Sequence, residues 1–114
     1  MFLKFPKDDS RFSWTDHIKR KMIQYQLSVA RIKRVLVSPD RKETGIAPNT
    51  LAAMKRNDRG NKKEEIWLMY AAKKAEKLKP SKVTMISTWR YPGVSPKNNR
   101  IPIPDEIIEE LGLE

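Results

Sequence analysis

The sequence predicts an α+β fold: two N-terminal helices packed on a small antiparallel sheet of three to four strands, followed by a short C-terminal helix. Residues 14–26 and 27–37 repeat apolar side chains every three or four positions, which is the period of an amphipathic helix. Residues 64–72 and 81–92 are rich in β-branched and aromatic side chains that alternate with a period of two, as in strands. Residues 105–111 are apolar and acidic, and the glycine that follows predicts the end of a short helix.

The chain has 114 residues, which is enough for one domain with a small core. We expect an N-terminal arm at residues 1–12, a core at 13–93, and a loop with an acidic helix at 94–114. Loosely alternating apolar residues in the arm predict an edge strand or a cover for the core. The acidic helix is expected to dock its apolar face on the same domain, and a partner's groove is the alternative.

Positive charge is the strongest compositional feature. The chain has 24 basic and 14 acidic residues, giving a net charge of +10. Five of the acidic residues and none of the basic ones lie in the last ten positions, so the first 104 residues carry +15. Such a field attracts polyanions, with nucleic acid ahead of an anionic membrane or an acidic protein. The alternative is that the basic residues only keep the chain soluble.

The composition also excludes several kinds of site. The chain has no cysteine, so it has no disulfide, thiolate nucleophile or Cys-ligated metal, which fits a cytoplasmic protein. A single histidine without clustered acids predicts no metal and no cofactor. No apolar run has the length of a signal sequence core or a membrane span, so we expect no membrane contact.

The first predicted helix carries a polar stripe beside its apolar one. Ser13 and Asp16 fit a capping box at its start. The apolar stripe, which we expect to be buried, consists of Trp14, Ile18, Met22 and Tyr25. The polar stripe consists of His17, Lys21 and Gln24, with Arg20 on the same flank. A lone histidine in a first turn is either a packing or capping residue or a functional group beside the basic stripe.

Shorter elements are predicted between the second helix and the long strands. Ser28 is expected to cap that helix. Residues 41–47 are predicted to be extended, and residues 50–54 to return as a second short strand or a short helix. The polar residues 57–63 predict a hairpin loop before the strand at 64–72, for which a helix is the alternative.

The strand at residues 81–92 ends in groups suited to a ligand. One predicted face consists of Val83, Met85, Ser87 and Trp89. The other consists of Thr84, Ile86, Thr88 and Arg90. Thr88, Arg90 and Tyr91 bring a hydroxyl, a fixed cation and a phenol to the strand end. Alternatively, Arg90 pairs with a carboxylate and Tyr91 packs under the following turn.

Several of these residues follow one another in a recognisable order. They are Trp14, His17, Lys21, Met22, Leu27, Ser28, Thr88, Arg90, Tyr91 and Pro92. Over residues 13–93 the chain resembles a small uncharacterised bacterial domain family with this order, in which Lys21 is often replaced by arginine. More distantly, the helix-helix-sheet order resembles the RelE-like and BrnT-like toxin ribonucleases, which implies a RelE/barnase-like fold.

The resemblance implies an RNA-binding protein that cleaves RNA without a metal. Such cleavage needs a base, an acid, and cations that stabilise the phosphorane. We expect His17 and Tyr91 to transfer protons, and Arg90 and Lys21 to hold the scissile phosphate. Further RNA contacts are expected at Arg20, Arg41 and Thr88. This hypothesis requires His17 and Arg90 to face each other between the first helix and the last strand.

Two other functions remain open. One is a nucleic-acid-binding module without catalysis, which the charge supports equally well. The other is a partner-binding domain whose basic face is covered by an acidic, antitoxin-like protein. The sequence has no motif for nucleotide hydrolysis, redox chemistry or acyl transfer.

Overall fold

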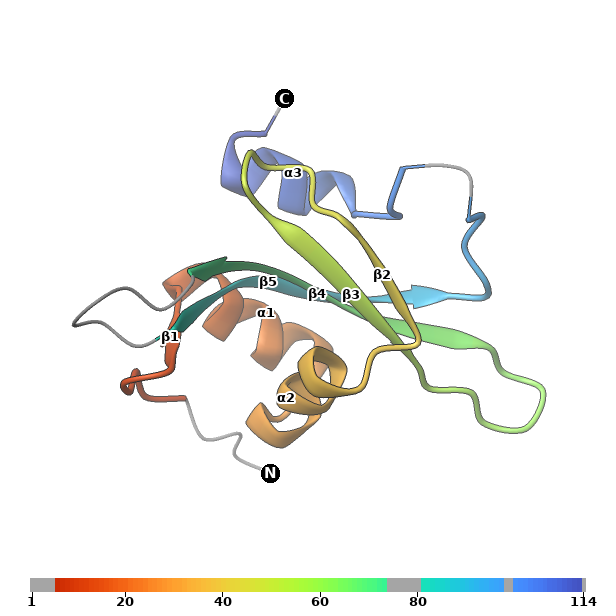
Figure 1. The fold of residues 1–114 in the computed structure, drawn as a ribbon. Coiled ribbons are helices and arrows are strands. Elements are labelled where there is room, and N and C mark those ends of the chain that lie inside the picture. Colours follow the sequence, from red (N-terminus) through yellow and green to blue (C-terminus); the bar gives the residue numbers. More distant parts are fainter. Residues whose placement is uncertain (1–5, 74–80, 98–99, 114) are drawn as a thin grey trace.

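The computed structural model describes residues 6–73, 81–97 and 100–113. Within these ranges it has three helices and one five-stranded sheet, so the predicted α+β class is confirmed. The helices are α1 (Asp16–Tyr25), α2 (Val29–Val37) and α3 (Asp105–Leu111). Helices α1 and α2 cover one face of the sheet and α3 covers the other (Figure 1). No helix in these ranges is long and apolar enough to cross a membrane.

The sheet is mixed rather than purely antiparallel. Its strands are β1 (Phe12–Trp14), β2 (Arg41–Thr44), β3 (Leu51–Arg56), β4 (Glu64–Lys73) and β5 (Lys82–Pro92). They lie in the order β1-β5-β4-β3-β2. All neighbours are antiparallel except β1, which runs parallel to β5. The prediction of an antiparallel sheet with three to four strands is therefore wrong in one respect, because it lacks the short parallel strand β1. The sequence pattern places the residues of β1 in the N-terminal arm and the first helix.

This extra strand also moves the start of α1. Ser13 and Trp14 lie in β1, so the capping residue is Thr15 rather than Ser13. The Thr15 Oγ1 accepts a hydrogen bond from the Ile18 amide at 3.1 Å. The same hydroxyl donates to the Ile86 carbonyl at 2.9 Å, just beyond the residues of β5 that β1 covers. Helix α1 therefore begins against the edge of β5 that β1 leaves open.

The other predicted elements form close to their expected positions. The Ser28 Oγ caps α2 by accepting from the Arg31 amide at 3.2 Å. The segments predicted to be extended form β2 and β3, and the apolar segment after the hairpin forms β4, so strand is correct over the helical alternative at both places. The arm residues Phe2, Leu3 and Phe5 lie outside the described residues.

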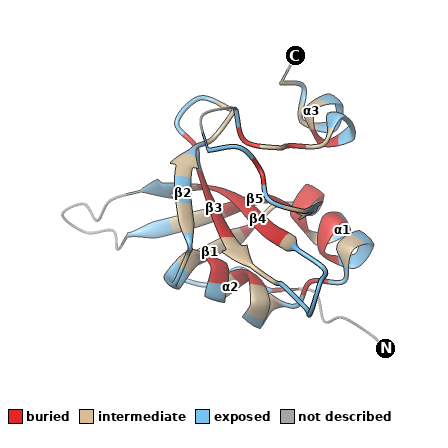
Figure 2. Cartoon of the chain, turned by 90° about the vertical axis from the view of Figure 1, so that its right-hand side faces the viewer, coloured by how far each residue is buried: buried red, intermediate tan, exposed pale blue. Residues whose placement is uncertain are grey.

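Two apolar clusters lie on the two faces of the sheet. The cluster under α1 and α2 includes Ile18 and Leu68. The cluster under α3 includes Trp67, Trp89 and Ile107, and the two indole rings stack with their centroids 6.1 Å apart. Figure 2 shows the buried residues along the central strands and on the inward sides of the helices. Docking of the acidic helix on its own domain is thus confirmed.

A β-bulge in β5 changes which residues share a face. Met69 pairs with Ser87, whereas the next residue, Tyr70, pairs with Met85, so Ile86 is left without a partner in β4. Met85 accordingly packs under α1 and α2, while Trp89 packs under α3. The predicted single face containing both residues is wrong, because strict alternation fails where a strand holds one extra residue.

Candidate functional site

His17 lies where α1, β5 and α3 meet, and it is 7% exposed. Its Nε2 forms a hydrogen bond with the Ser87 Oγ at 2.8 Å. Its Nδ1 lies 3.2 Å from the Glu110 Oε2, although the two groups are not aligned for a hydrogen bond. Burial lowers the pKa of His17, against the opposing effect of Glu110, so the neutral imidazole is favoured.

The order carboxylate, imidazole, hydroxyl is the order found in hydrolase triads. Here, however, Ser87 is fully buried beside the bulge of β5. A substrate carbonyl cannot approach the Ser87 Oγ in this arrangement, and the Glu110 contact lacks the alignment that orients a catalytic base. The three groups instead act as a polar link that joins α1 and α3 to the sheet.

Lys21 belongs to the same contact and is 3% exposed. Its Nζ donates to Gln24 at 2.9 Å, to Glu110 at 2.8 Å and to Glu106 at 3.3 Å. Burial acts to lower the pKa of Lys21, but the hydrogen bonds to Glu110 and Glu106 outweigh it and raise that pKa. Because an ammonium group has three donors, Lys21 has none left for a phosphate.

Arg90 lies at the opposite end of α1 from His17. Its Nε donates to the Tyr25 carbonyl at 2.7 Å, and its Nη2 donates to the Gln26 carbonyl at 3.3 Å. Its Nη1 pairs with Glu64 at 2.8 Å. Tyr25 follows His17 by eight residues, so the two ends are about 12 Å apart along the helix axis. Arg90 therefore holds the last carbonyls of α1 and does not meet His17.

The remaining predicted residues lie in other places. The Arg41 guanidinium stacks over the Trp67 ring, 5.2 Å from its centroid. Thr88 is fully buried, and its Oγ1 donates to the Trp67 carbonyl at 2.6 Å. Tyr91 packs against the cluster under α3, and Arg20 is exposed on α1. The structure thus brings His17 and Lys21 together but separates them from Arg90, and it distributes the others.

A buried carboxylate that sequence reasoning missed lies on the α3 side of the sheet. Glu65 is fully buried in β4. Its Oε2 accepts from the Arg56 Nη1 at 3.0 Å and from the Ser95 amide at 2.9 Å. Its Oε1 accepts from the Trp67 Nε1 at 2.9 Å and the Ser95 Oγ at 2.7 Å. The sequence signal that could have identified Glu65 is an acidic side chain on the same face as Trp67, directly before the apolar run of β4.

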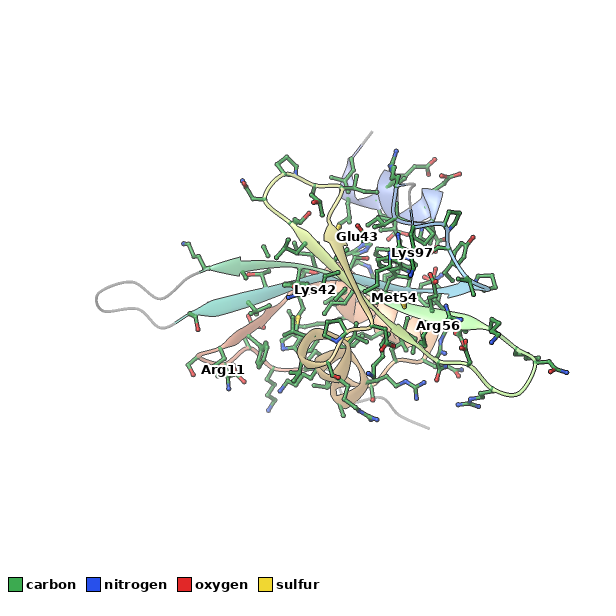
Figure 3. All side chains as sticks on the ribbon, turned by 45° about the vertical axis from the view of Figure 1, so that its right-hand side comes forward. Arg11, Lys42, Glu43, Met54, Arg56 and Lys97 are labelled. Carbon is green, nitrogen blue, oxygen red and sulfur yellow. The ribbon has the colours of Figure 1, made fainter. Side chains whose placement is uncertain are left out.

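Glu65 lies at the base of a pocket of about 470 Å³, which we call the Glu65 pocket. Its charged lining residues are Asp40, Arg41, Glu43, Arg56, Asp58, Lys63, Glu65 and Lys97. In Figure 3 the labelled Glu43, Met54, Arg56 and Lys97 lie beside one another on this side of the sheet. Acids and bases are equal in number among these residues, so the lining favours neither an anion nor a cation.

A second pocket, of about 190 Å³, lies between α2 and the end of β3. We call it the α2–β3 pocket, and its lining consists of Arg31, Arg34, Val35, Lys55, Arg56, Asn57 and Ile66. Val35 and Ile66 are 1% and 2% exposed, so they form a closed apolar floor. Four of the seven lining residues are basic and none is acidic, in contrast to the Glu65 pocket.

The cations of the α2–β3 pocket have donors to spare. Arg34 is exposed on α2 and takes part in no ion pair with a described residue. The Lys55 Nζ donates to the Ser38 carbonyl at 2.8 Å, which leaves two of its three donors. Arg31 donates from Nη2 to the side-chain oxygen of Asn57 and keeps its other N–H groups. Arg56 differs, since its guanidinium is held by carboxylates on the other side of the sheet.

The surroundings of Arg31 are also positively charged. Burial lowers the pKa of Arg31, and the neighbouring cations of Arg90, Arg34 and Arg59 lower it further. Glu64 opposes this effect, but one carboxylate does not balance that group of guanidinium ions. The pocket is therefore a place where an anion relieves repulsion between like charges that the fold already holds together.

The sequence pattern alone could not reveal this pocket. Arg31 and Arg34 fall outside the apolar period of the second predicted helix, and residues 57–63 are predicted to form a separate hairpin loop. Their spacing of three does put both arginines on one helix face. What the sequence lacks is the packing of α2 against β3 and β4, which brings that face to Lys55 and Asn57.

Metal ligands and relatives give no further indication. No group of three or more His, Asp or Glu side chains suited to a metal ion occurs in the part of the chain that the structure describes. Comparison of the chain with protein-family models, with curated proteins and with solved structures finds no match. The resemblance to a bacterial domain family and to RelE-like ribonucleases therefore stays a prediction from short sequence motifs.

Proposed function

We propose that this chain is a nucleic-acid-binding protein, with RNA as its ligand, that holds phosphate in the α2–β3 pocket. The observation that carries the proposal is a pocket whose lining has no acidic residue and includes three basic side chains, Arg31, Arg34 and Lys55, that no carboxylate holds. Arg31 and Arg34 from α2 and Lys55 from β3 provide spare N–H donors around one small volume. Guanidinium and ammonium groups in this arrangement suit phosphate oxygens.

Binding without cleavage is the better supported form of this function. His17 is buried and Arg90 is held by the last carbonyls of α1, so neither side chain is free to act on a phosphodiester. His17 and Arg90, two of the three predicted catalytic residues, also lie at opposite ends of α1. The pocket cations, in contrast, do not depend on either residue for their positions.

Salt-dependent binding of a labelled RNA, followed by fluorescence anisotropy, tests the proposal. Arg34→Ala should weaken binding by about fivefold near 0.1 M salt, because each phosphate contact on a single strand contributes a slope of about 0.7 in log affinity against log salt. The slope should become less steep by about the same amount. Arg34 is exposed, so this substitution should leave the fold intact.

Arg100→Ala is the matched control, since it removes the same side chain from an exposed position beside Ile101, on the face of the sheet that α3 covers. It should change the affinity less than twofold. Equal losses in the two variants would mean that general charge, and not the α2–β3 pocket, binds the RNA. Cleavage of the RNA in chelator by the wild-type protein would restore the enzymatic hypothesis.

A further inference from the structure

We propose that the α2–β3 pocket receives the terminal phosphate of an RNA strand rather than an internal phosphodiester. This inference rests on the proposed function and adds the part of the strand that enters the pocket. It draws on three features of the pocket: its volume, its closed floor and its charge.

The volume fits one phosphate group and not a nucleotide. Pockets that enclose a whole small ligand have volumes of about 300–1,000 Å³. The α2–β3 pocket, at about 190 Å³, is smaller than that range. At about 30 Å³ per liquid water, it replaces roughly six waters, which is enough for a phosphate and its first ester carbon. Its lining has no aromatic residue on which a base could stack, so recognition should not depend on the terminal base.

The floor restricts how a strand can enter. Val35 and Ile66 are buried beneath the cations and close the inner side of the pocket. An internal phosphodiester is bonded to the chain on both sides, so the strand would have to enter and leave through the same opening. A terminal phosphate has one ester bond and can point inward while the strand leads out to solvent.

The charge favours a dianion over a monoanion. A phosphate monoester carries about −1.5 to −2 charges at pH 7, whereas a diester carries one. Arg31, Arg34 and Lys55 face the pocket, and Arg59 and Arg90 add to the field at Arg31. Glu64 opposes that field, but the lining has no carboxylate, so the extra charge of a terminal phosphate increases the attraction.

Three RNAs of one sequence test the inference: one with a 5′-phosphate, one with a 3′-phosphate and one with hydroxyls at both ends. Anisotropy at fixed salt should give at least one phosphorylated end an affinity about five- to tenfold above that of the hydroxyl RNA. This advantage should disappear in Arg34→Ala and in Lys55→Ala, and it should persist in Arg100→Ala. It should also decrease from pH 7 to pH 5, as the monoester dianion takes up one proton at a pKa of about 6 and becomes a monoanion.

The outcomes separate this inference from the function on which it rests. If all three RNAs bind equally but Arg34→Ala weakens each of them, RNA binding stands and the terminal phosphate assignment is wrong. If no RNA binds, the proposed function fails as well. Competition by inorganic phosphate, by a nucleoside monophosphate and by a phosphoserine peptide identifies the source of the monoester. A peptide or a free phosphate that competes as well as the phosphorylated RNA would overturn the assignment to a strand end.

Discussion

At the scale of single residues, the charged side chains that are buried in the described part of the chain are fully hydrogen-bonded. The described cations with the fewest hydrogen-bond or ion-pair partners are exposed. Glu65 accepts four hydrogen bonds and Lys21 donates three. Such groups are costly to bury without partners, so their networks indicate structural roles. Arg34, exposed and outside any described ion pair, is the kind of residue that a ligand can use. Charge alone does not distinguish these two kinds of residue.

Replacing Glu65 should destabilise the fold more than its single charge suggests. All four partners of its carboxylate are donors, so the amide of Glu65→Gln would point two N–H groups at other N–H and O–H groups. We expect the free energy of unfolding to fall by about 3 kcal/mol or more, as when one member of a buried ionic network is removed. Urea denaturation at pH 7 measures the change.

Glu109→Gln is the control, because Glu109 is an exposed residue of α3 and undergoes the same chemical change. It should alter the free energy of unfolding by less than about 0.5 kcal/mol. A Glu65→Gln variant as stable as this control would show that the carboxylate does not hold Ser95 and Arg56 in place.

At the scale of elements, the contact between α1 and α3 is polar on its outer side and apolar beneath. Lys21 and Gln24 bind the carboxylates of Glu106 and Glu110, while Ile107 enters the cluster that contains Trp67. The acidic character of the last helix, which the sequence left open to a partner protein, is thus used within the chain. Lys21 is neutralised by these carboxylates and is buried, whereas Arg20 on the same flank of α1 stays exposed.

Acid should weaken this contact in two steps. Burial lowers the pKa of His17 below its ordinary 6.5. Below about pH 6.5 the unfolded chain therefore binds a proton at His17 more readily than the folded chain, and the folded state loses stability. The hydrogen bonds from Gln24 and Lys21 lower the pKa of Glu106 below 4.5. Its contribution to stability is present above pH 4.5 and is lost as the pH falls through the folded value. Stability should therefore decrease first from pH 7.5 to 5.5 and again below pH 4.5.

Urea midpoints at pH 7.5 and 5.5 isolate the first step, because both values lie above the range in which Glu106 takes up a proton. The wild-type midpoint should be lower at pH 5.5, and the difference should shrink in His17→Gln, which does not titrate. Other charged groups that act on His17 are Glu110, Lys21, Arg20 and Glu106, and all four are retained in the variant. An undiminished difference in His17→Gln would assign the pH dependence to a different group.

Sequence periodicity was sufficient for the long elements and insufficient for two short features. Helices α1 and α2 and strands β4 and β5 have enough residues for a period of 3.6 or 2 to be recognised. Strand β1 has three residues and forms only because β5 lies beside it. The bulge at Ile86 also depends on the register with β4, and no local pattern marks it.

At the scale of the whole molecule, the two faces of the sheet have different tasks. The α2–β3 pocket lies on the face covered by α1 and α2, and α3 with its acidic residues covers the other face. The sequence predicted the basic body and the acidic end but not their placement, because that depends on contacts between residues far apart in the chain. For the same reason it grouped His17 with Arg90, although His17 lies in the first turn of α1 and Arg90 of β5 binds the carbonyls at the other end of that helix.

This division predicts that stability and RNA binding can be changed separately. Ile107 is fully buried against the cluster that contains the stacked Trp67 and Trp89. Ile107→Ala should lower the free energy of unfolding by about 2–4 kcal/mol, as other large-to-small core substitutions do. RNA affinity of the folded variant should stay within twofold of wild type, because the pocket cations lie across the sheet from α3. Urea denaturation measures the free energy of unfolding, and anisotropy measures the RNA affinity. The tryptophan emission spectrum reports whether water enters the core under α3. A native emission spectrum together with a tenfold loss of RNA affinity would mean that the two faces are coupled through the sheet, and the pocket could then no longer be treated as independent of α3.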